Sequence, residues 1–183
     1  MYKRQYELEN TGVVVEFDPQ GVQQSPIIEA PVAAASQGPN DGALAVFQPN
    51  GEFVVATRVV MNGTSSSLKL GRFTESGARD STFSSAPFQF NLEASINDPD
   101  AIALQSNGKV LVGGLAANLD PFFDDFGLVR LNRNGTLDAT FGSGGRVTEA
   151  PSGSISGLLI QKDGKIVAVG GGSGGILARY LSK

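Results

Sequence analysis

One pattern of apolar and polar positions occurs three times along the chain. The phrase LQSNGKVLVGG begins at Leu104, and close copies, FQPNGEFVVAT and IQKDGKIVAVG, stand before and after it. In each copy a turn signal, Asn-Gly or Asp-Gly, separates two apolar runs, a pattern typical of a β-hairpin. The glutamines before the three turns, Gln48, Gln105 and Gln161, recur at intervals of 57 and 56 residues (105 − 48 and 161 − 105).

A second phrase alternates with the first. LGRFTESGARDSTF, from Leu70, matches LVRLNRNGTLDATF, from Leu128, at an interval of 58 residues (128 − 70). The residues that match are an arginine, a glycine, an aspartate, a threonine and a phenylalanine. In pairs they are Arg72 and Arg130, Gly77 and Gly135, Asp80 and Asp138, Thr82 and Thr140, and Phe83 and Phe141.

The two phrases together predict two hairpins per repeat. The first predicts that Ala101–Leu104 pairs with Lys109–Gly113 across a type I′ turn at Asn107-Gly108. The second predicts that Gly127–Leu131 pairs with the residues from Thr136 onward. Four strands in a unit of about 50 to 60 residues are the signature of a β-propeller blade.

The fold predicted is therefore all-β, a β-propeller-like array of four-stranded antiparallel blades. A β-sandwich need not repeat one phrase in its strands, and the coils of a β-helix are shorter than this unit. About three blades are expected, so the ring is incomplete, because a closed propeller has at least four. We predict the second half of a blade at about 12–40, blades at about 41–95 and 96–150, and a partial blade at about 151–183.

The phrases ALQSNGKVLVGG and FGLVRLNRNGTLDATFGSGGRVT resemble the delta-60 repeat, a family of propeller-forming repeats of unknown function. The resemblance extends from about Gly12 to Leu181 and departs at Glu16 and in the loop NLDPFFDDFG. It implies a large bacterial protein that is extracellular or attached to the cell surface, and it brings no established activity. Residues 1–5 match nothing downstream and are interpreted as an adaptor-like extension before the repeats of 6–183, so we expect a piece of a longer protein.

Composition removes several kinds of chemistry. The 183 residues include no Cys and no His, which excludes disulfides, thiol nucleophiles, histidine zinc ligands and Ser-His-Asp triads within this chain. The formal net charge is −4 and the 14 basic residues are scattered, so neither nucleic acid nor an anionic membrane surface is an expected partner. The apolar runs are also too short to insert into a membrane.

The residues that recur are expected to be structural, because a catalytic residue is normally needed once. We predict that Asp80 and Asp138 each cap backbone N–H groups before the following threonine and pair with the arginine of the same blade. Phe83 and Phe141 are expected to fill the gaps between blades. No catalytic or cofactor-binding residue is predicted.

Residues that do not repeat are the better candidates for binding. Two acidic stretches, INDPDA and NLDPFFDD, are expected in loops and carry the hard oxygen ligands that Ca²⁺ prefers, although neither has EF-hand spacing. Solvated turn residues are the favoured reading of both. Beside the second stretch, Phe122 and Phe123 form either an exposed aromatic platform for a sugar or peptide, or a cap on the sheet. The candidate metal ligands are Asp98, Asp100, Asp120, Asp124 and Asp125, with Asn97 beside them.

Three functions remain open at this point. The first is a non-enzymatic interaction or scaffold module of a larger secreted or surface bacterial protein. The second is a calcium-dependent module that binds carbohydrate or protein. The third and weakest is a calcium-dependent propeller hydrolase or lactonase. Calcium is the one cofactor considered, the ligand is an unknown protein or carbohydrate, and further blades are expected from the same longer chain or from other copies.

Overall fold

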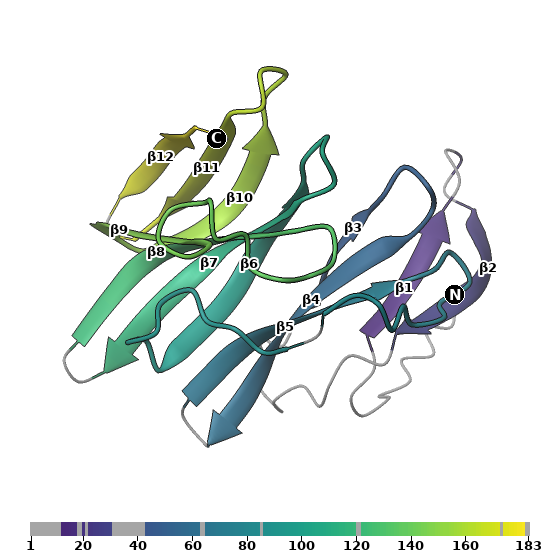
Figure 1. Cartoon of the computed structure of the whole chain (residues 1–183), viewed down its shortest axis with the longest axis horizontal. Helices are drawn as coiled ribbons and strands as arrows, with labels where there is room; N and C mark the ends of the chain where they lie inside the picture. The colour runs from purple at the N-terminus through teal and green to yellow at the C-terminus, as the bar shows by residue number, and fades with distance from the viewer. Residues whose placement is uncertain are drawn as a thin grey trace.

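The computed structural model describes residues 12–17, 20, 22–30, 43–62, 65–84, 86–119, 122–172 and 174–181. These residues form four antiparallel sheets and no helix, in the order of the chain (Figure 1). The first sheet pairs β1 (Gly12–Phe17) with β2 (Gln23–Ala30). The second has the order β3 (Leu44–Phe47), β4 (Phe53–Asn62), β5 (Ser65–Phe73).

The third sheet is the complete blade of the described chain. Its order is β6 (Ile96–Leu104), β7 (Val110–Leu119), β8 (Phe122–Leu131), β9 (Arg146–Ser152). The fourth sheet has three strands in the order β10 (Ser154–Ile160), β11 (Ile166–Gly171), β12 (Gly175–Tyr180).

The sheets stack face to face in an open array. Strand β6 contacts β3, β4 and β5 of the sheet before it and β10 of the sheet after it. The β1–β2 and β10–β12 sheets lie at opposite ends of the array (Figure 1). The predicted fold class, all-β with propeller-like antiparallel blades in an incomplete ring, is confirmed.

The first predicted hairpin has the expected strands but a different turn. Ala101 pairs with Gly113 and Leu104 pairs with Val110, as predicted. The Gly108 N–H, however, donates to the carbonyl of Gln105 at 2.8 Å, which makes a three-residue loop. The type I′ prediction is therefore wrong: Gly108, with φ of 80°, follows a β-turn as the left-handed residue of a bulge.

The asparagine before Gly108 has a separate task in this loop. Its side-chain oxygen accepts a hydrogen bond from the backbone N–H of Lys109 at 3.0 Å. Asn50 and Asp163 accept the same bond in the equivalent loops. The recurring Asn-Gly or Asp-Gly thus combines a side-chain acceptor with a residue that tolerates positive φ.

The second predicted hairpin is wrong in its outer strand. After the turn at Asn134-Gly135 only a single bridge forms, between Leu131 and Leu137. The strand that pairs with β8 is β9, in which Val147 lies opposite Leu128. The chain bends away after Leu137 because Asp138 binds the backbone of Thr140, and a glycine-rich turn then reverses it.

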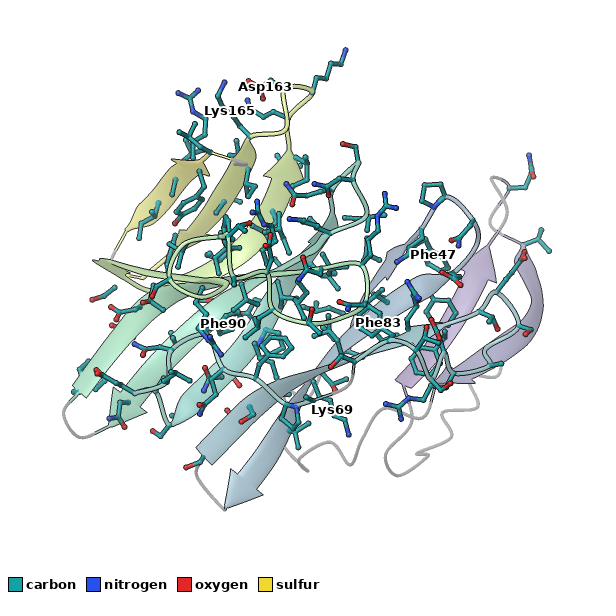
Figure 2. All side chains as sticks on the ribbon, viewed as in Figure 1. Phe47, Lys69, Phe83, Phe90, Asp163 and Lys165 are labelled. Atoms are coloured by element: carbon teal, nitrogen blue, oxygen red, sulfur yellow. The ribbon has the colours of Figure 1, made fainter. Side chains whose placement is uncertain are left out.

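Two apolar cores lie between the stacked sheets. One is shared by β3–β5 and β6–β9 and contains Phe83 and Phe90, which lie between these sheets in Figure 2. The other is shared by β6–β9 and β10–β12 and contains Phe141, Ile155 and Ile166. Because Phe83 and Phe141 each fill one core between sheets, the prediction made for them is confirmed.

Candidate functional site

The repeated aspartates form ion pairs inside their own blades. The Asp138 carboxylate accepts hydrogen bonds from Arg130 Nε and from Lys109 Nζ, both at 2.6 Å. Its other oxygen accepts from the Thr140 hydroxyl at 2.7 Å and from the Thr140 backbone N–H at 3.2 Å. The predicted structural role, a cap on the following bend combined with an arginine pair, is confirmed.

Asp80 repeats this arrangement with greater exposure to solvent. It accepts from Arg72 Nε at 2.7 Å and from the hydroxyl and N–H of Thr82 at 2.7 and 2.8 Å. The Asp80 side chain is 16% exposed, whereas that of Asp138 is 4% exposed. Each arginine also lies over the phenylalanine of its own blade, 5.3 Å from the Phe83 ring and 4.5 Å from the Phe141 ring.

These contacts keep both carboxylates ionised. Hydrogen bonds from Thr82, with a further bond from Arg72, lower the pKa of Asp80 to about 2. Burial raises the pKa of Asp138, but hydrogen bonds from Lys109, Thr140 and Arg130 outweigh burial, and the pKa is lowered well below its ordinary value. A carboxylate with so low a pKa is a poor proton acceptor at neutral pH.

The first acidic stretch lies in a strand and not in the expected loop. Asn97, Asp98 and Asp100 belong to β6, which has a bulge between Pro99 and Ala101. Proline is tolerated at such an irregularity because the ladder does not need its missing N–H there. The turn-like composition of INDPDA therefore concealed a strand.

These three side chains connect neighbouring sheets. Asn97 is fully buried, and its side-chain nitrogen donates to the carbonyl of Ser66 in β5 at 2.9 Å. Asp98 forms an ion pair with Arg58 of β4, with 2.9 Å between Oδ1 and Nε. Asp100 accepts a hydrogen bond from the Ser154 hydroxyl at the start of β10.

The second acidic stretch also contributes to a strand. Asp124 and Asp125 are consecutive residues of β8, so their side chains leave opposite faces of the sheet. Phe122 begins the same strand and is 75% exposed. Asp120 lies outside the described residues, as does the side chain of Phe123.

The described acidic residues do not converge on a metal site. No group of three or more His, Cys, Asp or Glu side chains in the described ranges could hold a metal ion. Asp98 and Asp100, the candidates of the first stretch, are directed at Arg58 and Ser154. Calcium binding stays a prediction from the sequence.

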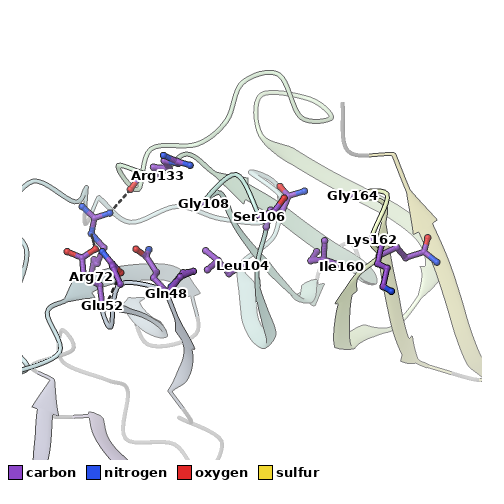
Figure 3. A pocket seen from close by; sticks show the side chains of 14 residues that line it. Gln48, Glu52, Arg72, Leu104, Ser106, Gly108, Arg133, Ile160, Lys162 and Gly164 are labelled. Atoms are coloured by element: carbon purple, nitrogen blue, oxygen red, sulfur yellow. Dashed lines mark hydrogen bonds and ion pairs between the residues drawn. The ribbon is translucent and has the colours of Figure 1, made fainter.

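A cavity of about 720 Å³ lies along the repeated hairpin loops. We call it the hairpin-loop cavity. Three loops that join the first and second strands of successive sheets, at 48–51, 105–108 and 161–164, contribute to its lining (Figure 3). Leu104 and Ile160, at the ends of β6 and β10, add apolar surface, and Gln105 is 4% exposed.

Hydrogen bonds join two sheets at one end of this cavity. Arg72, from β5, donates through an Nη to the carbonyl of Arg133 at 3.0 Å, a bond drawn as a dashed line in Figure 3. Arg133 in turn donates to the carbonyl of Asn107. These two bonds connect β5 to the 105–108 loop across the boundary between the sheets.

The outward side of the last sheet is a second candidate surface, which we call the β10–β12 face. Leu159 pairs with Val167, and Val169 pairs with Leu177, so these four side chains share one side of the sheet. Leu159 and Leu177 are 65% and 73% exposed. The opposite side, with Ile155 and Ile166, packs on β6–β9.

Both candidate surfaces were missed from the sequence. A glutamine recurs before each of the three turns of the first phrase. This recurrence was a sequence signal that could have pointed to the hairpin-loop cavity. Leu159 and Leu177 read as ordinary strand residues, since their exposure depends on what the neighbouring sheet covers.

The described residues contain no helix long and apolar enough to cross a membrane.

A family model described as a domain of unknown function (DUF5122) beta-propeller matches residues 105–141. This stretch begins at the buried glutamine and ends at Phe141, so it contains one copy of each repeated phrase. A search of curated proteins finds no match. A solved structure from Dyadobacter fermentans, described as a protein of unknown function, is similar at 15% identity and a TM-score of 0.45. The similarity covers 79% of this chain and 52% of that one, so the chain spans about half the length of that protein. By sequence and structure, this chain is built from β-propeller-type repeats.

Proposed function

We propose that the chain is a non-enzymatic interaction module whose β10–β12 face packs against another sheet of the same repeat. The observation that carries the proposal is the contrast between equivalent positions in two successive sheets. Leu128 is fully buried beneath the following sheet, whereas its equivalent Leu177 is 73% exposed. The equivalence follows from Arg130 and Arg179, each two residues further along.

The same contrast holds across the rest of the face. Ala103 is 9% exposed and its equivalent Leu159 is 65% exposed, and the fully buried Leu111 corresponds to the half-buried Val167. Arg130 is 1% exposed, while Arg179 is exposed. The β10–β12 face therefore has the residue types of a surface that another sheet covers inside this chain.

Two features favour a sheet of the same repeat as the partner. Inside the chain, the side of a sheet that carries residues such as Ile155 and Ile166 already covers this kind of face. Stacked repeats bury their apolar sides only against neighbours of the same kind. The resemblance to delta-60 repeats supports a place for the module in a larger secreted or surface bacterial protein.

In a solution of the isolated chain, a second copy is the available partner. We expect light scattering after size-exclusion chromatography to show self-association at tens of micromolar protein. Leu177→Glu should shift the mass to that of a monomer, because packing would bury the new carboxylate.

Leu92→Glu is the matched control. Leu92 is 72% exposed, so it is as accessible as Leu177, but it precedes β6 and is not part of the β10–β12 sheet. This variant should associate like the unmodified chain. A folded monomer at 100 μM, or association that survives Leu177→Glu, would count against the proposal.

A further inference from the structure

The side chain of Gln105 lines the hairpin-loop cavity and takes no part in the hydrogen bonds of its own turn. Its side chain is 4% exposed, and its Oε1 is buried with no hydrogen-bond partner among the residues that the structure describes. The hairpin loop does not use this amide, since backbone groups and the side chain of Asn107 make the bonds of the turn. A buried amide oxygen without a partner costs free energy, and such a group in a native structure requires an explanation.

Gln105 is buried because its loop is the central one of the three. Gln48 and Gln161 occupy the same position in the loops on either side, where Gln48 is half-buried and Gln161 is exposed. Neighbouring sheets therefore enclose the central amide within the cavity, next to the polar side chain of Ser106.

The cavity is positively charged in a protein of net negative charge. The described part of its lining contains three cations, Arg72, Arg133 and Lys162, and one carboxylate, Glu52. Arg72 is neutralised by Asp80 and lies 3.6 Å from Glu52. Lys162 has no ion pair among the described residues, and the Arg133 guanidinium hydrogen-bonds to a neutral carbonyl. The uncompensated charge favours an anionic ligand.

The positions of the two uncompensated cations indicate the shape of this ligand. Figure 3 shows Arg133 toward one end of the row of loops and Lys162 toward the other, with Ser106 between them. Among the described residues, the lining contains no aromatic ring on which a sugar could stack. A chain with a carboxylate toward each end and an amide between them matches these groups.

We infer that the hairpin-loop cavity binds a short acidic peptide segment, with a peptide group on the Gln105 amide and carboxylates on Arg133 and Lys162. An amide offers a donor and an acceptor together, which is what a peptide group requires, and a turn of the Gln105 side chain brings its buried Oε1 to the ligand. This site is separate from the β10–β12 face, so either proposal can fail without the other.

The test uses the peptide acetyl-Glu-Gly-Glu-amide and isothermal titration calorimetry on the whole chain. We expect binding, and we expect Gln105→Leu to weaken the affinity at least tenfold. The thermal midpoint of unfolding of this variant should stay the same or rise, because leucine is similar in size and removes the unpaired oxygen. A purely structural amide would give a lower midpoint instead.

Two lysines of one loop provide a matched pair. Lys162 lines the cavity, whereas Lys165 pairs with Asp163 and does not line it. Lys162→Gln should weaken binding about fivefold and Lys165→Gln should leave it unchanged. If Gln105→Leu does not fold, this pair of variants decides the question.

Three results would overturn the inference. The first is no heat from the acidic peptide at millimolar concentration. The second is equal affinity for acetyl-Gln-Gly-Gln-amide, which lacks the carboxylates. The third is binding of trigalacturonate in place of the peptide, which would assign the cavity to an acidic sugar.

Discussion

At the scale of single residues, the same sequence motif contributes differently to the stability of different blades. Asp138 and Asp80 make equivalent bonds to an arginine and a threonine, but Asp138 has Lys109 as a second cation and is nearly inaccessible to water. Removing one partner of a buried pair leaves the other charge uncompensated, which costs more than the pair itself contributes.

We therefore expect Asp138→Asn to lower the free energy of unfolding by about 3 kcal/mol. Asp80→Asn should cost about 1 kcal/mol, since water can solvate Arg72 when the charge is lost. Urea titrations followed by circular dichroism would measure both variants. Equal losses would contradict the role assigned to burial.

Acidification provides a second measurement on Asp80→Asn. Because the folded-state pKa of Asp80 is lowered, its ionisation stabilises the fold above the ordinary pKa of 3.8 and is lost as the pH falls through about 2. The stability of Asp80→Asn should fall less than that of the unmodified chain between pH 4 and about 2.

At the scale of strands and turns, the sequence predicted those elements that depend on only a few neighbouring residues. The two runs around Asn107-Gly108 alternate and pair as expected, because strand periodicity is visible in a few residues. The outer strand was misplaced because the Asp138 carboxylate accepts hydrogen bonds from Thr140 and so bends a segment that has the pattern of a strand. The burial of Gln105 could not be predicted, since it depends on the loops at 48–51 and 161–164, which are more than 50 residues away in the chain.

The hairpin loop itself can be tested at Gly108. Its φ of 80° is costly for residues with a Cβ, so Gly108→Ala should lower the free energy of unfolding by about 1 kcal/mol. Gly108→Asn should lose about half as much, because asparagine tolerates this conformation better. Gly174→Ala is the control, since a Cβ there meets nothing within 4 Å. Chemical denaturation of the three variants would measure the order.

At the scale of the whole molecule, each sheet is stabilised by the core that it shares with its neighbour, so the stabilities of neighbouring sheets are coupled. Ile155 belongs to the core between β6–β9 and β10–β12 and is fully buried. The other core, between β3–β5 and β6–β9, does not include it. Nearest-neighbour coupling of this kind is typical of repeat proteins.

We expect Ile155→Ala to destabilise the chain by about 3 kcal/mol, and we expect the sheets to lose stability to different extents. In amide hydrogen exchange, protection should fall most in β10–β12, less in β6–β9 and least in β3–β5. Uniform loss across all sheets would instead indicate a single cooperative unit.

The phenylalanine between sheets has a consequence for synthesis on the ribosome. Phe83 follows β5 in the chain but packs beside Gly135 of the next blade, and the Ser84 N–H donates to the Asn134 carbonyl at 2.7 Å. The β3–β5 sheet therefore obtains its full set of contacts only after the Asn134-Gly135 turn has left the exit tunnel. During translation the β3–β5 sheet must wait for part of its successor, so its apolar side stays exposed to chaperones and proteases until that turn has formed.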